Sequence, residues 1–244
     1  MLMSYIFREH IKQSLAVIAF LLTLTACTSE SYDAGDGPNS YLTADLVLLH
    51  TSQDKSVRSA LLDDGTTLQF SNPFAQDWLT RPDSVYRALL YYDKTVAASD
   101  AAASNPTATS IVRARSVSPV SVLRPVEAED METLRTDPVG FESLWMSKNK
   151  SYINLSLLLK SGKTEADDAL HALGIVSHGT TTDADRRRTL HLTLYHDQGG
   201  VPAYYTVQQY VSIPTQLLEE ADTVELTLNT YNGKKVVKVA VSNL

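Results

Sequence analysis

The feature of this sequence that most constrains its fold is a period of two in the placement of apolar side chains. Residues 190–195 and 224–229 alternate leucine or valine with polar residues, and residues 153–159 and 204–213 show the same spacing. Successive side chains of a strand point to opposite faces of a sheet, so this alternation is typical of strands that bury one face. β-branched and aromatic residues fill many of these positions, as strands favour. We therefore expect an all-β protein.

Three turns predict hairpins; they are Asn232-Gly233, Asp63-Asp64-Gly65 and residues 197–200. The first would join residues 224–230 to 235–241 in a two-residue loop, because both central positions of such a loop need a positive φ. The second would join residues 56–62 to 66–70. The third would join residues 190–196 to 203–213. Six strands after residue 150 with short connections predict an antiparallel β-sandwich, which we assign to residues 121–244.

A shorter set of strands precedes the sandwich, at residues 41–50, 56–62, 66–70, 84–92 and 109–117. Five short strands in this length predict a small OB-like barrel over residues 41–120. Residues 96–107 are small and polar and are expected to form a loop, the alternative being one helical turn through the alanines. Two prolines make residues 117–125 an extended connector. Residues 127–134 are the place where we expect a short helix.

The N-terminal residues 1–26 have the three parts of an export signal. Arg8 and Lys12 supply a positive start, residues 15–24 are apolar and uncharged, and small residues follow. The apolar run is about half of the ~20 residues that a membrane-spanning helix needs, which favours a cleaved leader over a permanent span. Residues 27–40 are polar and rich in turn formers, as expected of a flexible tether.

The chain has a single cysteine, and it lies at the end of this leader. Leu24-Thr25-Ala26-Cys27 resembles the lipobox of bacterial lipoproteins, in which cleavage between Ala26 and Cys27 would leave a lipidated Cys27 as the new N-terminus. An ordinary secretory signal that happens to contain a cysteine is the alternative. Two or more acyl chains hold a protein stably on a membrane. We therefore expect a lipid anchor in the cell envelope, at the outer membrane, with the membrane face left open.

Beyond the leader, several segments resemble the NigD-like lipoproteins. They are the aromatic strand Val85-Tyr86-Arg87-Ala88-Leu89-Leu90-Tyr91-Tyr92, the segment from Asp137-Pro138 to Trp145, Tyr152-Ile153-Asn154-Leu155 and the closing Val224-Glu225-Leu226-Thr227-Leu228-Asn229-Thr230-Tyr231-Asn232. The resemblance implies an OB-like domain followed by a C-terminal β-sandwich. It also implies the role in bacteriocin immunity that was proposed for the family. It defines no catalytic residues.

Histidines and paired aspartates are the candidate metal-binding or catalytic residues of this sequence. His191 and His196 are five residues apart in one expected strand and so lie on opposite faces, and His171 and His178 lie on separate segments. We expect solvated or edge histidines and no metal site. Asp63-Asp64 and Asp167-Asp168 are expected to cap turns.

No catalytic or cofactor-binding motif is present in the sequence. It contains no nucleophile elbow, phosphate-binding loop or dinucleotide turn, so neither catalytic residues nor a cofactor are assigned. The net charge of −7 argues against nucleic acid as a partner. The basic run Arg186-Arg187-Arg188 is expected to be a solvated loop.

Tyrosines are unusually frequent in the expected strands, at Tyr91, Tyr92, Tyr204, Tyr205 and Tyr210. They either pack in the core or form an exposed face that could stack on a sugar or on a protein. The sequence therefore predicts an envelope-anchored lipoprotein that binds a protein or glycan partner and is not an enzyme. Bacteriocin immunity is the alternative, and hydrolysis of an envelope glycan is a weaker one.

Overall fold

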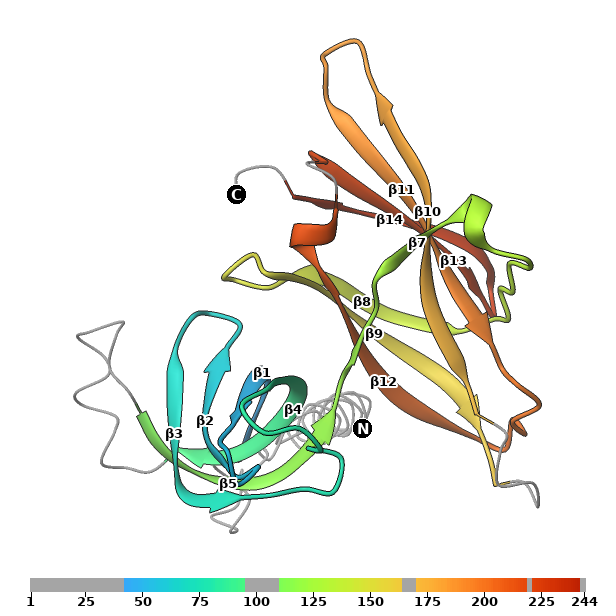
Figure 1. Ribbon diagram of the computed structural model, residues 1–244. Helices are drawn as coiled ribbons and strands as arrows, with labels where there is room; N and C mark the ends of the chain where they lie inside the picture. Colours follow the sequence, from blue (N-terminus) through green and yellow to red (C-terminus); the bar gives the residue numbers. More distant parts are fainter. Residues whose placement is uncertain (1–41, 95–109, 164–169, 219–220, 242–244) are drawn as a thin grey trace, which may run out of the picture. The chain divides into compact units, whose positions relative to one another are not determined.

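The computed structural model describes residues 42–94, 110–163, 170–218 and 221–241 (Figure 1). The predicted leader, the tether, Ala26 and Cys27 lie outside these ranges, as does the predicted loop at residues 96–107. Within the described ranges, no helix is long and apolar enough to cross a membrane.

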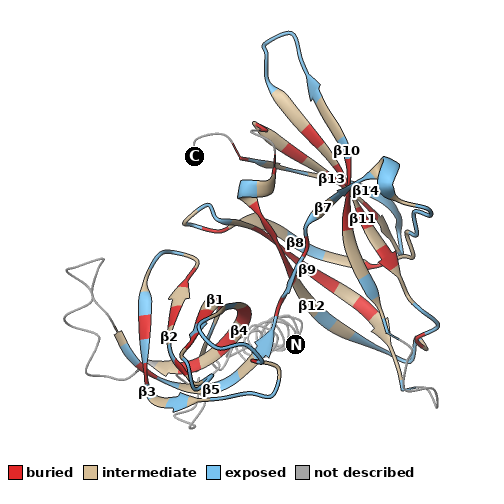
Figure 2. Ribbon diagram, viewed as in Figure 1, coloured by how far each residue is buried: buried red, intermediate tan, exposed pale blue. Residues whose placement is uncertain are grey.

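The first five strands close into a barrel in the order β1-β2-β3-β5-β4, with β1 hydrogen-bonded to both β2 and β4. Their bounds are Leu42–Thr51, Val57–Leu62, Thr67–Phe74, Val85–Lys94 and Ser110–Pro119. The alternating residues of these strands place Val47, Leu49 and Leu90 inside the barrel, where they are buried (Figure 2). The OB-like barrel predicted from the sequence is confirmed.

The remaining strands form two sheets that share one core. The first sheet has the order β14-β13-β11-β10-β7 and the second the order β6-β12-β9-β8. The strands are β6 (Ser121–Val122), β7 (Pro125–Glu127), β8 (Gly140–Met146), β9 (Tyr152–Ser161), β10 (Ala172–Thr182), β11 (Arg188–Asp197), β12 (Tyr205–Pro214), β13 (Thr223–Thr230) and β14 (Gly233–Ala240). Leu155 of one sheet and Leu192 of the other belong to the same buried cluster, which confirms the sandwich.

The sandwich is mixed rather than purely antiparallel. β11 pairs with β13 in parallel, and the predicted extended connector supplies β6 and β7, which pair in parallel with β12 and β10. These two short strands end one edge of each sheet, a position that tolerates Pro125 because its missing N–H costs no ladder bond there. The segment around Trp145, which was not predicted as a strand, forms β8 at the opposite edge of its sheet.

The predicted hairpin at residues 197–200 is wrong. β11 lies in the five-stranded sheet and β12 in the four-stranded sheet, so the turn between them crosses the sandwich. Leu194 and Val211 both point into the shared core from opposite sides, which a pairing of the two strands in one sheet would prevent. Gly199 and Gly200 have φ of 60° and 78°, conformations that glycine adopts at no steric cost.

The two other predicted hairpins are present. In the β13–β14 hairpin, Thr230 pairs with Gly233, so the loop residues are Tyr231 and Asn232. Only Gly233 has a positive φ, of 102°, and the prediction that Asn232 shares this conformation is wrong. The hydroxyl of Thr230 instead accepts a hydrogen bond from the Asn232 amide and holds the turn.

The expected helix at residues 127–134 is one short 3-10 turn, Ala128–Asp130. A second 3-10 turn, Thr215–Leu217, directly follows Pro214 at the end of β12 and was not predicted.

Candidate functional site

The outer face of the four-stranded sheet is polar, and part of it is buried. Ile153, Leu155 and Leu157 of β9 point into the sandwich core, while Asn154 and Ser156 point the other way. Both of these polar residues are nevertheless buried, with exposed fractions of 0% and 2%. A buried polar group is costly unless it is hydrogen-bonded, so this face must supply partners for its own side chains.

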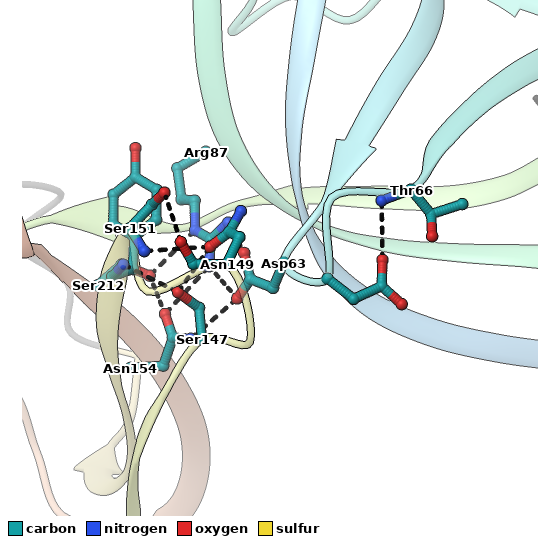
Figure 3. A network of polar contacts seen from close by, with 10 residues as sticks. Asp63, Thr66, Arg87, Ser147, Asn149, Ser151, Asn154 and Ser212 are labelled. Atoms are coloured by element: carbon teal, nitrogen blue, oxygen red, sulfur yellow. Dashed lines mark hydrogen bonds and ion pairs between the residues drawn. The ribbon is translucent and has the colours of Figure 1, made fainter. Parts of the chain in front are cut away.

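Arg87 of barrel strand β4 is the central hydrogen-bond partner of the buried polar residues on this face (Figure 3). Its two terminal nitrogens donate to the two carboxylate oxygens of Asp63, over 2.6 and 2.7 Å. Its Nε donates to Ser212 of β12 over 3.1 Å, and one terminal nitrogen also donates to Asn154 over 3.0 Å. We call Asp63, Arg87, Asn154 and Ser212 the joint, because they link the barrel to the sandwich.

The joint satisfies its own polar groups. Asn154 donates to Asp63 over 2.9 Å and accepts from the Ser212 hydroxyl over 2.7 Å. The guanidinium of Arg87 also lies 4.3 Å from the centre of the Tyr152 ring, a cation–π contact. A buried ion pair compensates for desolvation only with such complete bonding, so the joint is a structural contact.

Beside the joint lies a cavity of about 430 Å³, which we call the cleft. It is lined from the barrel by Ala44, Asp45, Leu46, Leu62, Asp63, Asp64, Leu89 and Tyr91, and from the sandwich by Glu142, Ser143, Trp145, Met146, Ser147, Lys148, Ser156, Gln208 and Tyr210. Its volume is in the range of small-molecule binding sites, ~300–1,000 Å³.

Three aromatic side chains contribute to the lining of the cleft, and all of them are partly exposed. Trp145 of β8 and Tyr210 of β12 meet edge to face, with ring centres 6.4 Å apart. Tyr91 of β4 lines the cleft from the barrel. Flat rings that reach solvent beside apolar residues can stack on a flat or cationic ligand group.

Two carboxylates of the cleft are hydrogen-bonded but not neutralised. Glu142 accepts from the Ser156 hydroxyl over 2.6 Å and from the Gln208 amide over 2.5 Å. Asp45 accepts from the Tyr92 hydroxyl over 2.8 Å. Within the described ranges, neither carboxylate has a basic side chain at ion-pair distance. The burial of Tyr92, together with the charge of Asp45, raises the pKa of this tyrosine, which therefore stays a neutral donor.

Residues 122–241 match the family described as the NigD-like C-terminal beta sandwich domain. The C-terminal domain of this chain belongs to the NigD-like family. The resemblance found in the sequence is thereby confirmed for the sandwich, which supplies Glu142, Trp145, Gln208 and Tyr210 to the cleft. No curated protein matches the chain significantly.

Several solved structures share the fold of both the barrel and the NigD-like domain. A NigD-like immunity protein from Bacteroides caccae is 22% identical, with a TM-score of 0.58 over 81% of this chain and 91% of that one. A putative toxin-related protein from Parabacteroides distasonis is 19% identical, with a TM-score of 0.54 over 81% and 92%. A putative lipoprotein from Bacteroides fragilis is 14% identical, with a TM-score of 0.57 over 82% and 98%.

The sequence predicts solvated or edge histidines, but one histidine of the NigD-like domain is buried. His191 and His196 do lie on opposite faces of β11, but His196 faces inward and is only 1% exposed. Its Nδ1 donates to the Asp137 carbonyl over 3.0 Å, so its Nε2 must accept from His171 Nδ1, 2.9 Å away. His178 and His191 bond threonine hydroxyls on the outer face. Among the described residues, no three acidic, histidine or cysteine side chains converge as metal ligands.

The paired aspartates divide into two roles. Asp64 accepts from the Thr66 amide over 2.9 Å and caps its turn as predicted. Burial opposes ionisation of Asp64, but the hydrogen bonds from Thr66 and the charge of Lys148 lower its pKa. Asp63 was expected to cap the same turn and instead binds Arg87, because the hairpin points its side chain at the joint. Asp167 and Asp168 lie outside the described residues.

The tyrosines and arginines that the sequence analysis names lie in different environments. Tyr92 is buried, whereas Tyr204 and Tyr205 are 78% and 50% exposed outside the cleft. Arg186 and Arg187 lie in the exposed turn between β10 and β11, as expected of a solvated loop, whereas Arg188 is the partly buried first residue of β11.

Sequence reasoning missed Arg87 and Asn154 as partners. The available signal was weak: a charged residue in the apolar strand β4, and an asparagine inside the most apolar strand of the sandwich. Each indicates a buried polar contact but not its partner.

Proposed function

We propose that the chain is a lipid-anchored protein of the bacterial envelope that binds a protein or glycan partner in the cleft and catalyses no reaction. The observation that carries the proposal is the cleft, which combines partly exposed aromatic rings with carboxylate and amide groups. Such a mixture of apolar walls and a few convergent polar groups is characteristic of binding sites. Glu142 and Asp45 are held by neighbouring side chains and serve in this proposal as acceptors for a ligand.

A pair of matched tyrosine variants tests the cleft as the binding site. Tyr91→Ala removes a cleft ring, and Tyr204→Ala removes a ring on the exposed surface outside it. The full chain, purified in mild detergent, is screened on arrays of glycans and of peptides. We expect Tyr91→Ala to lose the bound signal and Tyr204→Ala to keep it. The reverse result would move the binding site to the exposed tyrosines and reject the cleft.

The anchor is proposed from the motif at Leu24-Thr25-Ala26-Cys27, with cleavage before Cys27 and placement in the outer membrane. The name of the Bacteroides fragilis structure, a putative lipoprotein, is in keeping with it. Cys27→Ala should move the protein from the detergent phase to the aqueous phase in detergent partitioning. Mass spectrometry of the native protein should find acyl chains on Cys27, and an uncut leader or a free thiol would reject the anchor.

Bacteriocin immunity is the second candidate, and it is favoured by the name of the Bacteroides caccae structure, a NigD-like immunity protein. In this role the cleft would capture a toxin or shield its receptor. Cells that lack the gene are challenged with a co-produced bacteriocin. Reduced survival, restored by the wild-type gene and not by the Tyr91→Ala variant, would support it; unchanged survival would remove it.

A further inference from the structure

We propose that the group bound in the cleft is a guanidinium, the side chain of an arginine on a protein partner. This inference rests on the proposed function and names its ligand class. It is drawn from three observations on the described residues: unpaired negative charge, aromatic rings at the same cavity, and an arginine already bound in the same manner by the adjacent joint.

The charges that line the cleft do not cancel. Asp63 is neutralised by Arg87 in the joint, and the charge of Lys148 contributes to the lowered pKa of Asp64. Asp45 and Glu142 remain, each hydrogen-bonded by neutral side chains. Asp45 is partly buried and Glu142 is exposed at the cleft, and a carboxylate beside apolar walls attracts a cation more strongly than one in bulk water. A cationic group would therefore gain from entering the cleft, and an anionic one would be repelled.

The aromatic rings select among cations. A guanidinium is planar, stacks on tryptophan and tyrosine, and binds a carboxylate through two parallel hydrogen bonds, which an ammonium cannot do. Trp145, Tyr210 and Tyr91 line the same cavity as Glu142 and Asp45. The cleft thus offers both of the contacts that distinguish arginine from lysine.

The joint shows that this chain already uses the arrangement. Arg87 binds the two oxygens of Asp63 and lies over the ring of Tyr152. Here the guanidinium comes from the chain itself and the contact is closed. In the cleft, carboxylates and rings are also present and reach solvent. Lys148 lines the same cavity, but among the described residues no basic side chain lies at ion-pair distance from Asp45 or Glu142.

The size of the cleft and the charge of the chain indicate how the arginine is presented. A cavity of about 430 Å³ admits a side chain or two and not a folded domain. This size fits the proposed ligand, a protruding side chain on a larger partner. The net charge of −7 also favours the approach of a basic protein surface.

The test uses the full chain in mild detergent and calorimetric titration with blocked tri-arginine, tri-lysine and tri-glutamine peptides, and with neutral oligosaccharides. Glu142→Gln removes the charge and keeps an acceptor oxygen. Glu132→Gln is the matched control, an equal loss of charge on an exposed residue outside the cleft. We expect tri-arginine to bind severalfold more tightly than tri-lysine, with tri-glutamine silent. Glu142→Gln should weaken tri-arginine about tenfold, in line with the loss of a charged hydrogen bond, and Glu132→Gln should leave it unchanged.

Each other outcome has a distinct meaning. Equal weakening by Glu142→Gln and Glu132→Gln would show a diffuse charge effect and overturn the guanidinium site. Oligosaccharide binding that Tyr91→Ala abolishes, with all peptides silent, would overturn the guanidinium and leave the proposed function standing. Silence of every probe, together with blank glycan and peptide arrays, would overturn both.

Discussion

The joint and the cleft lie side by side on one polar face of the sandwich and are built from the same kinds of residue. In the joint, the carboxylate of Asp63 has its arginine, its amide and its hydroxyl partners, and little of it reaches water. In the cleft, Glu142 and Asp45 have hydroxyl or amide donors, and no basic side chain in the described part of the chain forms an ion pair with them. The comparison teaches that the same chemistry is structural where the chain supplies the cation and is available for a ligand where it does not.

The largest expected effect comes from opening the joint. Arg87→Met keeps much of the side-chain volume and leaves the partly buried Asp63 against Asn154 without its cation. Removing one partner of a buried ion pair costs about 3–5 kcal/mol, because the other charge is left uncompensated. We expect the free energy of unfolding, from denaturant titration, to fall by that amount.

Arg58 provides the matched control for this measurement. Its side chain is 66% exposed and lies 4.0 Å from Asp54, a surface pair of the kind that contributes about 0–1 kcal/mol. Arg58→Met should change the unfolding free energy within that range. If Arg87→Met lowered the free energy of unfolding no more than Arg58→Met does, the joint would not be a major contributor to stability.

The neighbouring aspartates give the next largest contrast. Asp63→Asn removes the charge opposite Arg87 but keeps an acceptor oxygen for the guanidinium, so we expect the loss to be that of a hydrogen bond to a charged group, about 1.5–3 kcal/mol. Asp64→Asn keeps a side chain that caps the turn at Thr66 and should cost only a few tenths of a kcal/mol. Thermal unfolding of the two variants side by side measures the difference. Equal losses would contradict the division of roles between these two residues.

The strands could be predicted from the sequence because their signal is local. The alternation in β9, β11 and β13 shows within each strand which face is buried. The turn at residues 197–200 shows the limit of that signal. A glycine turn has the same local sequence whether it joins neighbours in one sheet or crosses from one sheet to the other.

The joint and the cleft could not be predicted, because their partners are distant in sequence. Arg87 is 125 residues from Ser212, and Asp63 is 91 residues from Asn154. Only the docking of β4 against β9 and β12 brings them together. The sequence indicated that Asn154 and Ser156 share a face, but not that a second layer would bury that face.

Substitution of the cleft carboxylate Glu142 should have only a small effect on stability. Glu142 is exposed and its bonds to Ser156 and Gln208 can be replaced by water. Glu142→Gln should therefore change the unfolding free energy by no more than about 0.5 kcal/mol, as is usual for surface substitutions. The same denaturant titration measures it. A loss as large as that of Asp63→Asn would show that Glu142 is structural and would remove the distinction between joint and cleft.

The pair His171–His196 is a third polar contact to compare with the joint and the cleft. Its ring nitrogens are close together, and neither ring has a carboxylate partner among the described residues. Burial, and then the neighbouring His196, lowers the pKa of His171 in the folded protein. The unfolded chain therefore binds a proton that the folded chain resists, and stability rises with pH.

The contribution of His171 is fully present above its unfolded pKa of ~6.5 and is lost as the pH falls through the lower, folded value. Unfolding midpoints measured between pH 8 and pH 5 should decline over that window, by less than the joint variants lose. His171→Gln should flatten the decline while leaving the midpoint at pH 8 nearly unchanged. A decline of equal size in the variant would assign the pH dependence to other groups, and the His171–His196 contact would then be a neutral packing contact.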